Sequence, residues 1–148
     1  MVESDEAMIP RALPLTVHPD ARGRLMVLCE EGAPHIYMTT IYPGVIKAWH
    51  QHERQLDRMT CIKGMVRIVC SQSVAGNVPS LYEFISGEHS PIRVDIPSGW
   101  WHGLQALGSE EAVVVNCPDA AYCEEHPDEI RLPWNDPLIP FDWMRRNG

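Results

Sequence analysis

GVIKAWHQHERQLDRMTCIKG, from Gly44 to Gly64, is the stretch that decides the fold of this chain. It places His50 and His52 one residue apart and Asp57 five residues further on. Side chains alternate along a strand with a period of two, so both imidazoles lie on one face of an extended segment. This arrangement suits a metal ion, but two unrelated polar residues on a half-buried strand give the same pattern. The rest of the chain has to decide between the two interpretations.

Length and charge exclude several classes of protein. The chain has 148 residues, of which 22% are charged and 45% hydrophobic, and this predicts one domain over residues 1–148. A net charge of -8 argues against binding to nucleic acid or to anionic membranes, because both require clustered Lys and Arg. The sequence has neither a spanning apolar run nor the pattern of a signal peptide, so we expect a cytoplasmic protein.

Short runs rich in Val, Ile, Thr and Tyr recur between Gly and Pro residues, whereas helical periodicity is hard to find. Nine short strands separated by turns indicate an all-β sandwich or jelly roll. The tail HPDEIRLPWNDPLIPFDW is expected to form an irregular C-terminal strap packed by Trp134 and Trp143. The predicted strands are 24–30, 35–42, 45–52, 58–64, 65–72, 81–86, 92–97, 102–107 and 112–118.

The spacing of Gly44, His50, His52, Asp57 and Gly64 resembles the first motif of the cupin superfamily, with Asp in place of Glu. Further along, PSGWWH at 97–102 resembles the second cupin motif, although Pro91 and Ala106 replace a glycine and an asparagine of that motif. The resemblance implies a cupin jelly roll, also called a double-stranded β-helix. In it His50 and His52 point inward from one strand, Asp57 from the next, and His102 from the opposite sheet.

Three imidazoles and one carboxylate form a ligand set that suits a divalent transition metal such as Zn, Fe, Mn or Ni. We therefore predict a metal at His50, His52, Asp57 and His102, and no organic cofactor.

A second resemblance covers about Leu15 to Trp143. The segments HPDARGRLMVL, KAWHQH, IPSGWWHG and RLPWNDPLIPFDW are similar to motifs of the dTDP-4-dehydrorhamnose 3,5-epimerases. These cupin-fold (RmlC-like) enzymes act on nucleotide-linked 4-keto sugars without needing a metal, and this chain looks like a short relative of them. The resemblance implies an isomerase, specifically a carbohydrate epimerase. It also implies a homodimer in which the N-terminal segment reaches across to the neighbour.

The same resemblance assigns roles to individual residues. His50 matches the base that removes protons next to the keto group, and Tyr122 matches the tyrosine that returns a proton from the other face. His102 matches the second active-site histidine. Lys47 stands where an arginine binds the diphosphate, and Arg22 matches an arginine of the nucleotide site.

Trp49 and Trp101 flank the predicted site. They are candidates for stacking on a sugar or a base, and core packing is the alternative.

Two departures from the family leave the mechanism open. The family's lysine downstream of the active histidine falls on Asp57, so the cation that polarises the keto oxygen is missing. The acid that orients the base belongs to a C-terminal extension that this sequence lacks, while a glutamine of the family is replaced by His52. These changes together favour a metal that stabilises the oxyanion, but a His50 bound to a metal cannot also act as the free base.

Three functions therefore remain. The first is a sugar epimerase or ketoisomerase that acts on an activated, nucleotide-linked 4-keto-deoxy sugar by proton abstraction, with the help of a metal. The second is a metal-dependent cupin enzyme, an oxygenase or isomerase, acting on another small molecule. The third is a cupin that binds a small molecule without catalysis.

Overall fold

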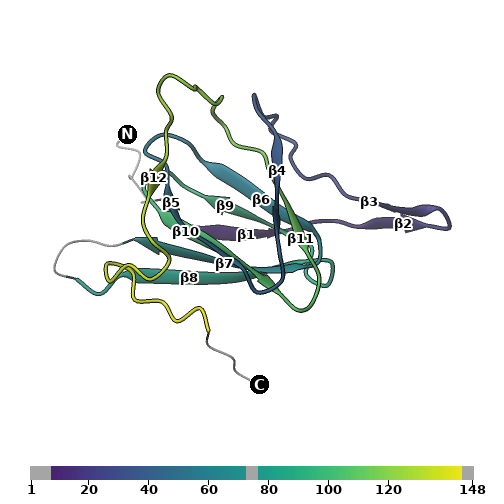
Figure 1. The fold of residues 1–148 in the computed structure, drawn as a ribbon. Coiled ribbons are helices and arrows are strands. Elements are labelled where there is room, and N and C mark those ends of the chain that lie inside the picture. Colours follow the sequence, from purple (N-terminus) through teal and green to yellow (C-terminus); the bar gives the residue numbers. More distant parts are fainter. Residues whose placement is uncertain (1–7, 73–76, 145–148) are drawn as a thin grey trace, which may run out of the picture.

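The computed structural model describes residues 8–72 and 77–144. Two five-stranded antiparallel sheets face each other, and a two-stranded hairpin projects from one end of the molecule (Figure 1). The first sheet has the order β1-β9-β6-β11-β4 and the second has the order β12-β5-β10-β7-β8. This confirms the predicted all-β jelly roll. Within the described ranges, the fold contains no helix long and apolar enough to cross a membrane.

The strands are short and closely match most of the predicted runs. Their bounds are β1 Arg11–Pro14, β2 His18–Asp20, β3 Gly23–Leu25, β4 Tyr37–Ile41, β5 Ile46–Gln51, β6 Asp57–Lys63, β7 Met65–Gln72, β8 Ser80–Gly87, β9 Ile92–Ile96, β10 Trp101–Leu107, β11 Ala112–Asn116 and β12 Ile130–Arg131.

The main core lies between the two sheets and follows from the alternation of apolar residues along each strand. In β7, Val66, Ile68 and Cys70 are fully buried and point into this core, whereas the intervening Val69 belongs to a second cluster. Fully burying an aliphatic side chain contributes about 1.5–3 kcal/mol to the free energy of folding, so packing between the two sheets stabilises the barrel.

The second cluster covers the outer face of the second sheet. There Trp49, Trp101 and Val69 pack against Ile139 and Trp143 of the C-terminal strap. The ring centroids of Trp49 and Trp143 are 5.0 Å apart. The strap is therefore ordered by burial, as expected.

Trp134 departs from the prediction for the strap, because its side chain is 49% exposed. Its backbone carbonyl still fixes the strap, since it accepts a hydrogen bond from Trp49 Nε1 at 3.2 Å.

The predicted strand at 24–30 is wrong for most of its length. Only its first residues form β3, which pairs with β2 in the projecting hairpin, and the chain then leaves the sheets. Strands β1, β2 and β12 were not predicted. β1 ends at Pro14, and the surrounding prolines suggest a loop, but a sheet edge tolerates proline because one side needs no ladder hydrogen bonds.

Candidate active site

The two cupin motifs meet on neighbouring strands. β5 pairs with β10 in the second sheet, and His50 lies directly opposite His102. The resemblance predicted that His102 comes from the opposite sheet. This prediction is wrong, because β10 lies beside β5 in the same sheet. Asp57 does come from the opposite sheet, because β6 belongs to the first sheet. Side chains from both inner faces thus converge at one end of the barrel.

A β-bulge changes which β5 side chains face inward. The register shifts between His102, which pairs with His50, and Leu104, which pairs with Lys47, so one extra residue is inserted in β5. Lys47 and His50 consequently line the same cavity although they are three positions apart in the sequence. Gly103 lies opposite the bulge, where an added Cβ would be only 2.5 Å from Ala48 Cβ, so this position requires glycine.

His52, Asp57 and His102 form a compact group, here called the three-residue cluster. Their ligating atoms all lie within 4.8 Å of one another. Asp57 Oδ2 is 3.3 Å from His52 Nε2 and 3.4 Å from His102 Nε2. Neither contact has the geometry of a good hydrogen bond, so Asp57 Oδ2 is a buried carboxylate oxygen without a hydrogen-bond donor.

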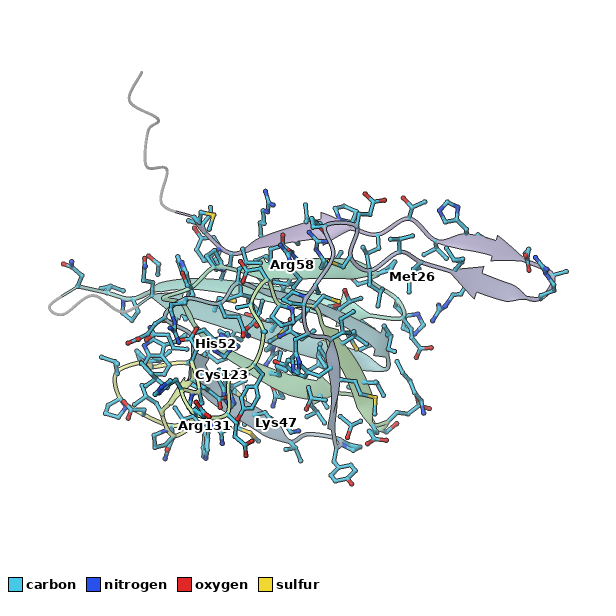
Figure 2. All side chains as sticks on the ribbon, turned by 90° about the horizontal axis from the view of Figure 1, so that it is seen from above. Met26, Lys47, His52, Arg58, Cys123 and Arg131 are labelled. Carbon is cyan, nitrogen blue, oxygen red and sulfur yellow. The ribbon has the colours of Figure 1, made fainter. Side chains whose placement is uncertain are left out.

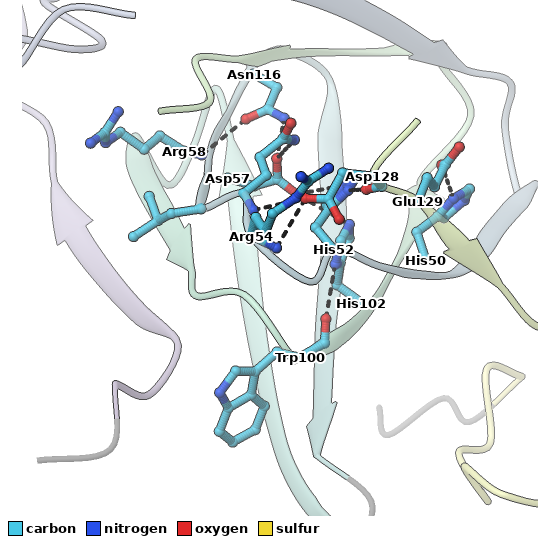
Figure 3. A network of polar contacts seen from close by, with 12 residues as sticks. His50, His52, Arg54, Asp57, Arg58, Trp100, His102, Asn116, Asp128 and Glu129 are labelled. Carbon is cyan, nitrogen blue, oxygen red and sulfur yellow. Dashed lines mark hydrogen bonds and ion pairs between the residues drawn. The ribbon is translucent and has the colours of Figure 1, made fainter. Parts of the chain in front are cut away.

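Surrounding polar groups fix the orientation of the cluster (Figure 3). Asp57 Oδ1 accepts hydrogen bonds from Gln55 Nε2 at 2.6 Å and from Asn116 Nδ2 at 2.7 Å. His52 Nδ1 donates to the backbone carbonyl of Asp128, and His102 Nδ1 lies 3.3 Å from the carbonyl of Trp100. Because carbonyls only accept, these contacts place a hydrogen on each Nδ1 and direct each Nε2 toward Asp57.

The buried charges shift the pKa values of the cluster. Burial alone would lower the pKa of His52, but its contact with the Asp57 carboxylate raises that pKa to about 9. Burial lowers the pKa of His102 to about 4. Burial would raise the pKa of Asp57, but its contacts with the two histidines bring it down to about 2. A neutral His102 thus directs the lone pair of Nε2 at a carboxylate oxygen. The two atoms repel each other, and a cation bound between them would remove this repulsion.

His50 is paired separately. Its Nδ1 lies 2.7 Å from Glu129 Oε1, and the other carboxylate oxygen of Glu129 accepts a hydrogen bond from Arg131 Nη2 at 2.7 Å. The structure does not bring His50 into the three-residue cluster, although its ring stacks on His102 with centroids 6.0 Å apart. A carboxylate partner for His50 was expected to be missing, but Glu129, from the segment before β12, lies beside its ring.

Two cavities adjoin at this end of the barrel. The barrel cavity, about 550 Å³, is lined by Lys47, His50, His102 and Arg131 among others. The outer cavity, about 610 Å³, is lined largely by the segment from Ala120 to Glu129. Tyr37, His52 and Glu129 line both. In Figure 2, Lys47, His52, Cys123 and Arg131 gather at this end, whereas Met26 lies toward the hairpin.

The remaining predicted site residues lie in different places. Tyr122 is in the outer cavity, 63% exposed, and stacks on His35. Trp49 is fully buried in the second cluster and reaches the wall of the barrel cavity.

Trp101 does not fit the role of a substrate-stacking residue. It points out of the barrel into the second cluster, because the alternation of β10 turns its neighbour His102 inward. Arg22 lies in the turn of the projecting hairpin, between β2 and β3, where it pairs with Asp20 at 2.6 Å, and it lines neither cavity.

Several functional candidates were missed by the sequence analysis. Asp128 accepts backbone hydrogen bonds from Glu53, Arg54 and Gln55 at 2.9, 3.0 and 3.0 Å, and thereby holds the turn after His52. Gln55 orients Asp57, because its Nε2 donates a hydrogen bond to Asp57 Oδ1. The adjacent acids Asp128 and Glu129 stand just before a short apolar run, and only the pairing of β12 with β5 explains their importance.

A jelly roll with histidines and a carboxylate gathered at one end of its barrel defines a cupin. The chain belongs to the family described as the polysaccharide biosynthesis C-terminal domain, which matches residues 18–130.

Two relatives illustrate the similarity in sequence. The probable low-salt glycan biosynthesis epimerase Agl13 of Haloferax volcanii is 37% identical over 139 residues, covering 87% of this chain and 89% of the relative. The spore coat polysaccharide biosynthesis protein SpsL of Bacillus subtilis is 35% identical over 107 residues, covering 69% of each.

Among solved structures, the dTDP sugar isomerase of Desulfovibrio desulfuricans G20 superimposes with a TM-score of 0.84 at 22% identity, covering 93% of this chain and 92% of that one. These comparisons confirm the predicted RmlC-like family and the predicted enzyme class, an isomerase of the epimerase kind.

Proposed function

We propose that this protein epimerises a nucleotide-linked 4-keto-deoxy sugar, with His50 as the base that removes a proton next to the keto group. The observation that carries this proposal is the 2.7 Å contact between His50 Nδ1 and Glu129 Oε1. An ionised carboxylate only accepts, so Nδ1 carries a hydrogen, and in the neutral imidazole the lone pair is on Nε2. The contact thus orients the ring of His50, which lines the barrel cavity.

The reaction requires one proton to leave and one to return. His50 Nε2 takes the proton from the carbon next to the ketone, and the electron pair moves onto the keto oxygen as an enolate. The carboxylate of Glu129 stabilises the imidazolium that forms. Protonation of the same carbon from the opposite face inverts its configuration, and Tyr122 in the adjoining outer cavity is the candidate acid.

The three-residue cluster fits a divalent transition metal, which would be held by His52 Nε2, Asp57 Oδ2 and His102 Nε2. The fit rests on Asp57 Oδ2, a buried oxygen without a hydrogen-bond donor that faces two imidazole nitrogens. Such an ion would supply fixed positive charge to the end of the cavity. Because His50 lies outside this cluster, the metal and the base no longer compete for one residue.

Cations around the cavity suit the nucleotide part of the substrate. Lys47 lines the barrel cavity, and its Nζ donates to Thr39 Oγ1 at 2.9 Å, which holds the ammonium across to β4. Arg22 is exposed on the projecting hairpin and would serve a neighbouring subunit in the homodimer that we expect. Both are proposed to bind the diphosphate or nucleotide.

Solvent exchange tests this function directly. The protein is incubated with dTDP- and UDP-linked 4-keto-6-deoxy sugars in deuterated water, and deuterium at C3 and C5 is followed by NMR. We expect incorporation by the wild type and by His89→Asn, a control in the turn between β8 and β9, and none by His50→Asn. Absence of exchange with both substrates would remove the epimerase and favour a metal-dependent reaction on another small molecule.

A further inference from the structure

The proposed reaction needs a donor at the keto oxygen, because an enolate forms there as the proton leaves. The lysine that the family resemblance places in this role is Asp57 here. The Lys47 and Arg131 side chains line the barrel cavity, but the Lys47 ammonium is held by Thr39 and the Arg131 guanidinium by Glu129. A neutral hydrogen-bond donor on the opposite wall can stabilise the oxyanion whether or not the three-residue cluster holds a metal.

Tyr37 occupies such a position. It begins β4 in the first sheet, facing the sheet that carries His50, and it lines both the barrel cavity and the outer cavity. Its ring is tilted against His35, with centroids 5.5 Å apart. The phenol thus lies at the junction between the proposed base and the segment that carries Tyr122.

The hydrogen bonds of Asn116, the partner of Tyr37 in the sheet register, fix the direction of the phenol. Asn116 Oδ1 accepts from the backbone N–H of Arg58 at 2.9 Å, and Asn116 Nδ2 donates to Asp57 Oδ1 at 2.7 Å. The amide is thereby oriented, so its Nδ2 donates to the Tyr37 hydroxyl oxygen at 2.8 Å. Since the oxygen accepts this bond, the phenol hydrogen is directed to another acceptor.

The charges around Tyr37 keep that hydrogen in place. Burial raises the pKa of the phenol, the hydrogen bond from Asn116 lowers it, and the carboxylates of Asp57 and Glu129 raise it again, so that it lies above its usual range. The hydroxyl therefore remains protonated at neutral pH. The bond from Asn116 also links the phenol to the three-residue cluster through Asp57.

We propose that Tyr37 is a catalytic residue whose hydroxyl donates a hydrogen bond to the keto oxygen of the bound sugar. This inference rests on the epimerase function proposed above. As His50 takes the proton from carbon, negative charge develops on the keto oxygen and the hydrogen bond from Tyr37 strengthens. The phenol keeps its hydrogen, so the step needs no other reactant and leaves all oxidation states unchanged.

The first test compares Tyr37→Phe with Tyr42→Phe. Tyr42 follows β4, is 69% exposed and serves as the matched control. Removing one oxyanion donor costs about 10²–10³ in kcat. We expect Tyr37→Phe to lower kcat for epimerisation about 100-fold while KM changes less than threefold, and Tyr42→Phe to match the wild type. A Tyr37→Phe enzyme within threefold of the wild-type kcat would overturn the assignment.

The second test separates catalysis from a structural role and also serves if Tyr37→Phe does not fold. Replacement of Tyr37 by 3,5-difluorotyrosine preserves shape and makes the phenol more acidic. If the protonated phenol is required, the alkaline fall of kcat moves to lower pH by about one unit or more. An unchanged pH profile refutes the role of Tyr37. If the wild type itself shows no exchange with either nucleotide sugar, the epimerase proposal fails first and this inference fails with it.

Discussion

Replacing Glu129 by Gln tests the pairing that gives His50 its role as base. The amide keeps the size of the side chain but removes the negative charge 2.7 Å from His50 Nδ1. A hydrogen bond to a charged group contributes about 1.5–3 kcal/mol. The Glu129 side chain is 31% exposed and shares its charge with Arg131, which points to the lower part of this range, about 1.5–2.5 kcal/mol. At 1.36 kcal/mol per factor of ten, this predicts a loss of roughly 13- to 70-fold in kcat.

The assay is the rate of epimerisation and of deuterium exchange, measured for Glu129→Gln and for Glu125→Gln. Glu125 is an exposed acid of the same segment and serves as the matched control. We expect the control to match the wild type, and the KM of Glu129→Gln to change less than kcat, because the charge matters most when the imidazolium forms. A Glu129→Gln enzyme within threefold of the wild type would refute the reasoning, since His50 would then need no carboxylate partner.

Three further predictions concern the cluster and the barrel. Elemental analysis should find close to one equivalent of a divalent transition metal in the wild type and in His89→Asn, but less than about a tenth in His52→Ala; equal metal in all three would contradict the cluster as ligand set. Metal-free protein should be most stable near pH 6.5 in urea titrations. The stabilisation from His52, whose folded pKa is about 9, is lost as pH rises through 9, and the cost of charging His102, whose folded pKa is about 4, appears as pH falls from 6.5 to 4. We expect the free energy of unfolding to fall by at most about 2 kcal/mol on each side of the maximum after solvent screening. A free energy of unfolding that does not change with pH would contradict the charges assigned to the cluster. Gly103→Ala should lower the free energy of unfolding by about 1–3 kcal/mol, because the new Cβ would overlap the neighbouring alanine and tryptophan; an unchanged urea midpoint would show that the bulge can adapt.

The sequence predicts the parts of the site that are encoded locally. His50 lies on β5 and His52 directly follows that strand, and their spacing to Asp57 and to the second motif reflects strand and turn lengths that the jelly roll fixes. The convergence of His52, Asp57 and His102 is therefore predictable from the motifs. The sheet that carries His102 was assigned wrongly, because strand order in a sheet follows from long-range pairing that no local pattern records.

The unpredicted residues depend on contacts that are distant in sequence. Glu129 reaches His50 only because β12, a strand of two residues, pairs with β5. Tyr37 and Asn116 looked like ordinary strand residues, and their link to Asp57 becomes evident only from the pairing of β4 and β6 with β11. The separation of His50 from the three-residue cluster likewise depends on the bulge and on the Glu129 contact, which spacing alone does not reveal.

The contacts of Asp128 and Glu129 also bear on when the protein becomes active during its synthesis. Strands β5 and β10 lie before residue 108, whereas Asp128 and Glu129, which contact His52 and His50, follow later in the chain. A nascent polypeptide that has emerged only as far as β11 has the imidazoles of His50 and His52 but not the groups that contact them. On the proposed mechanism, proton abstraction has to wait until this later segment has been made and has docked beside β5.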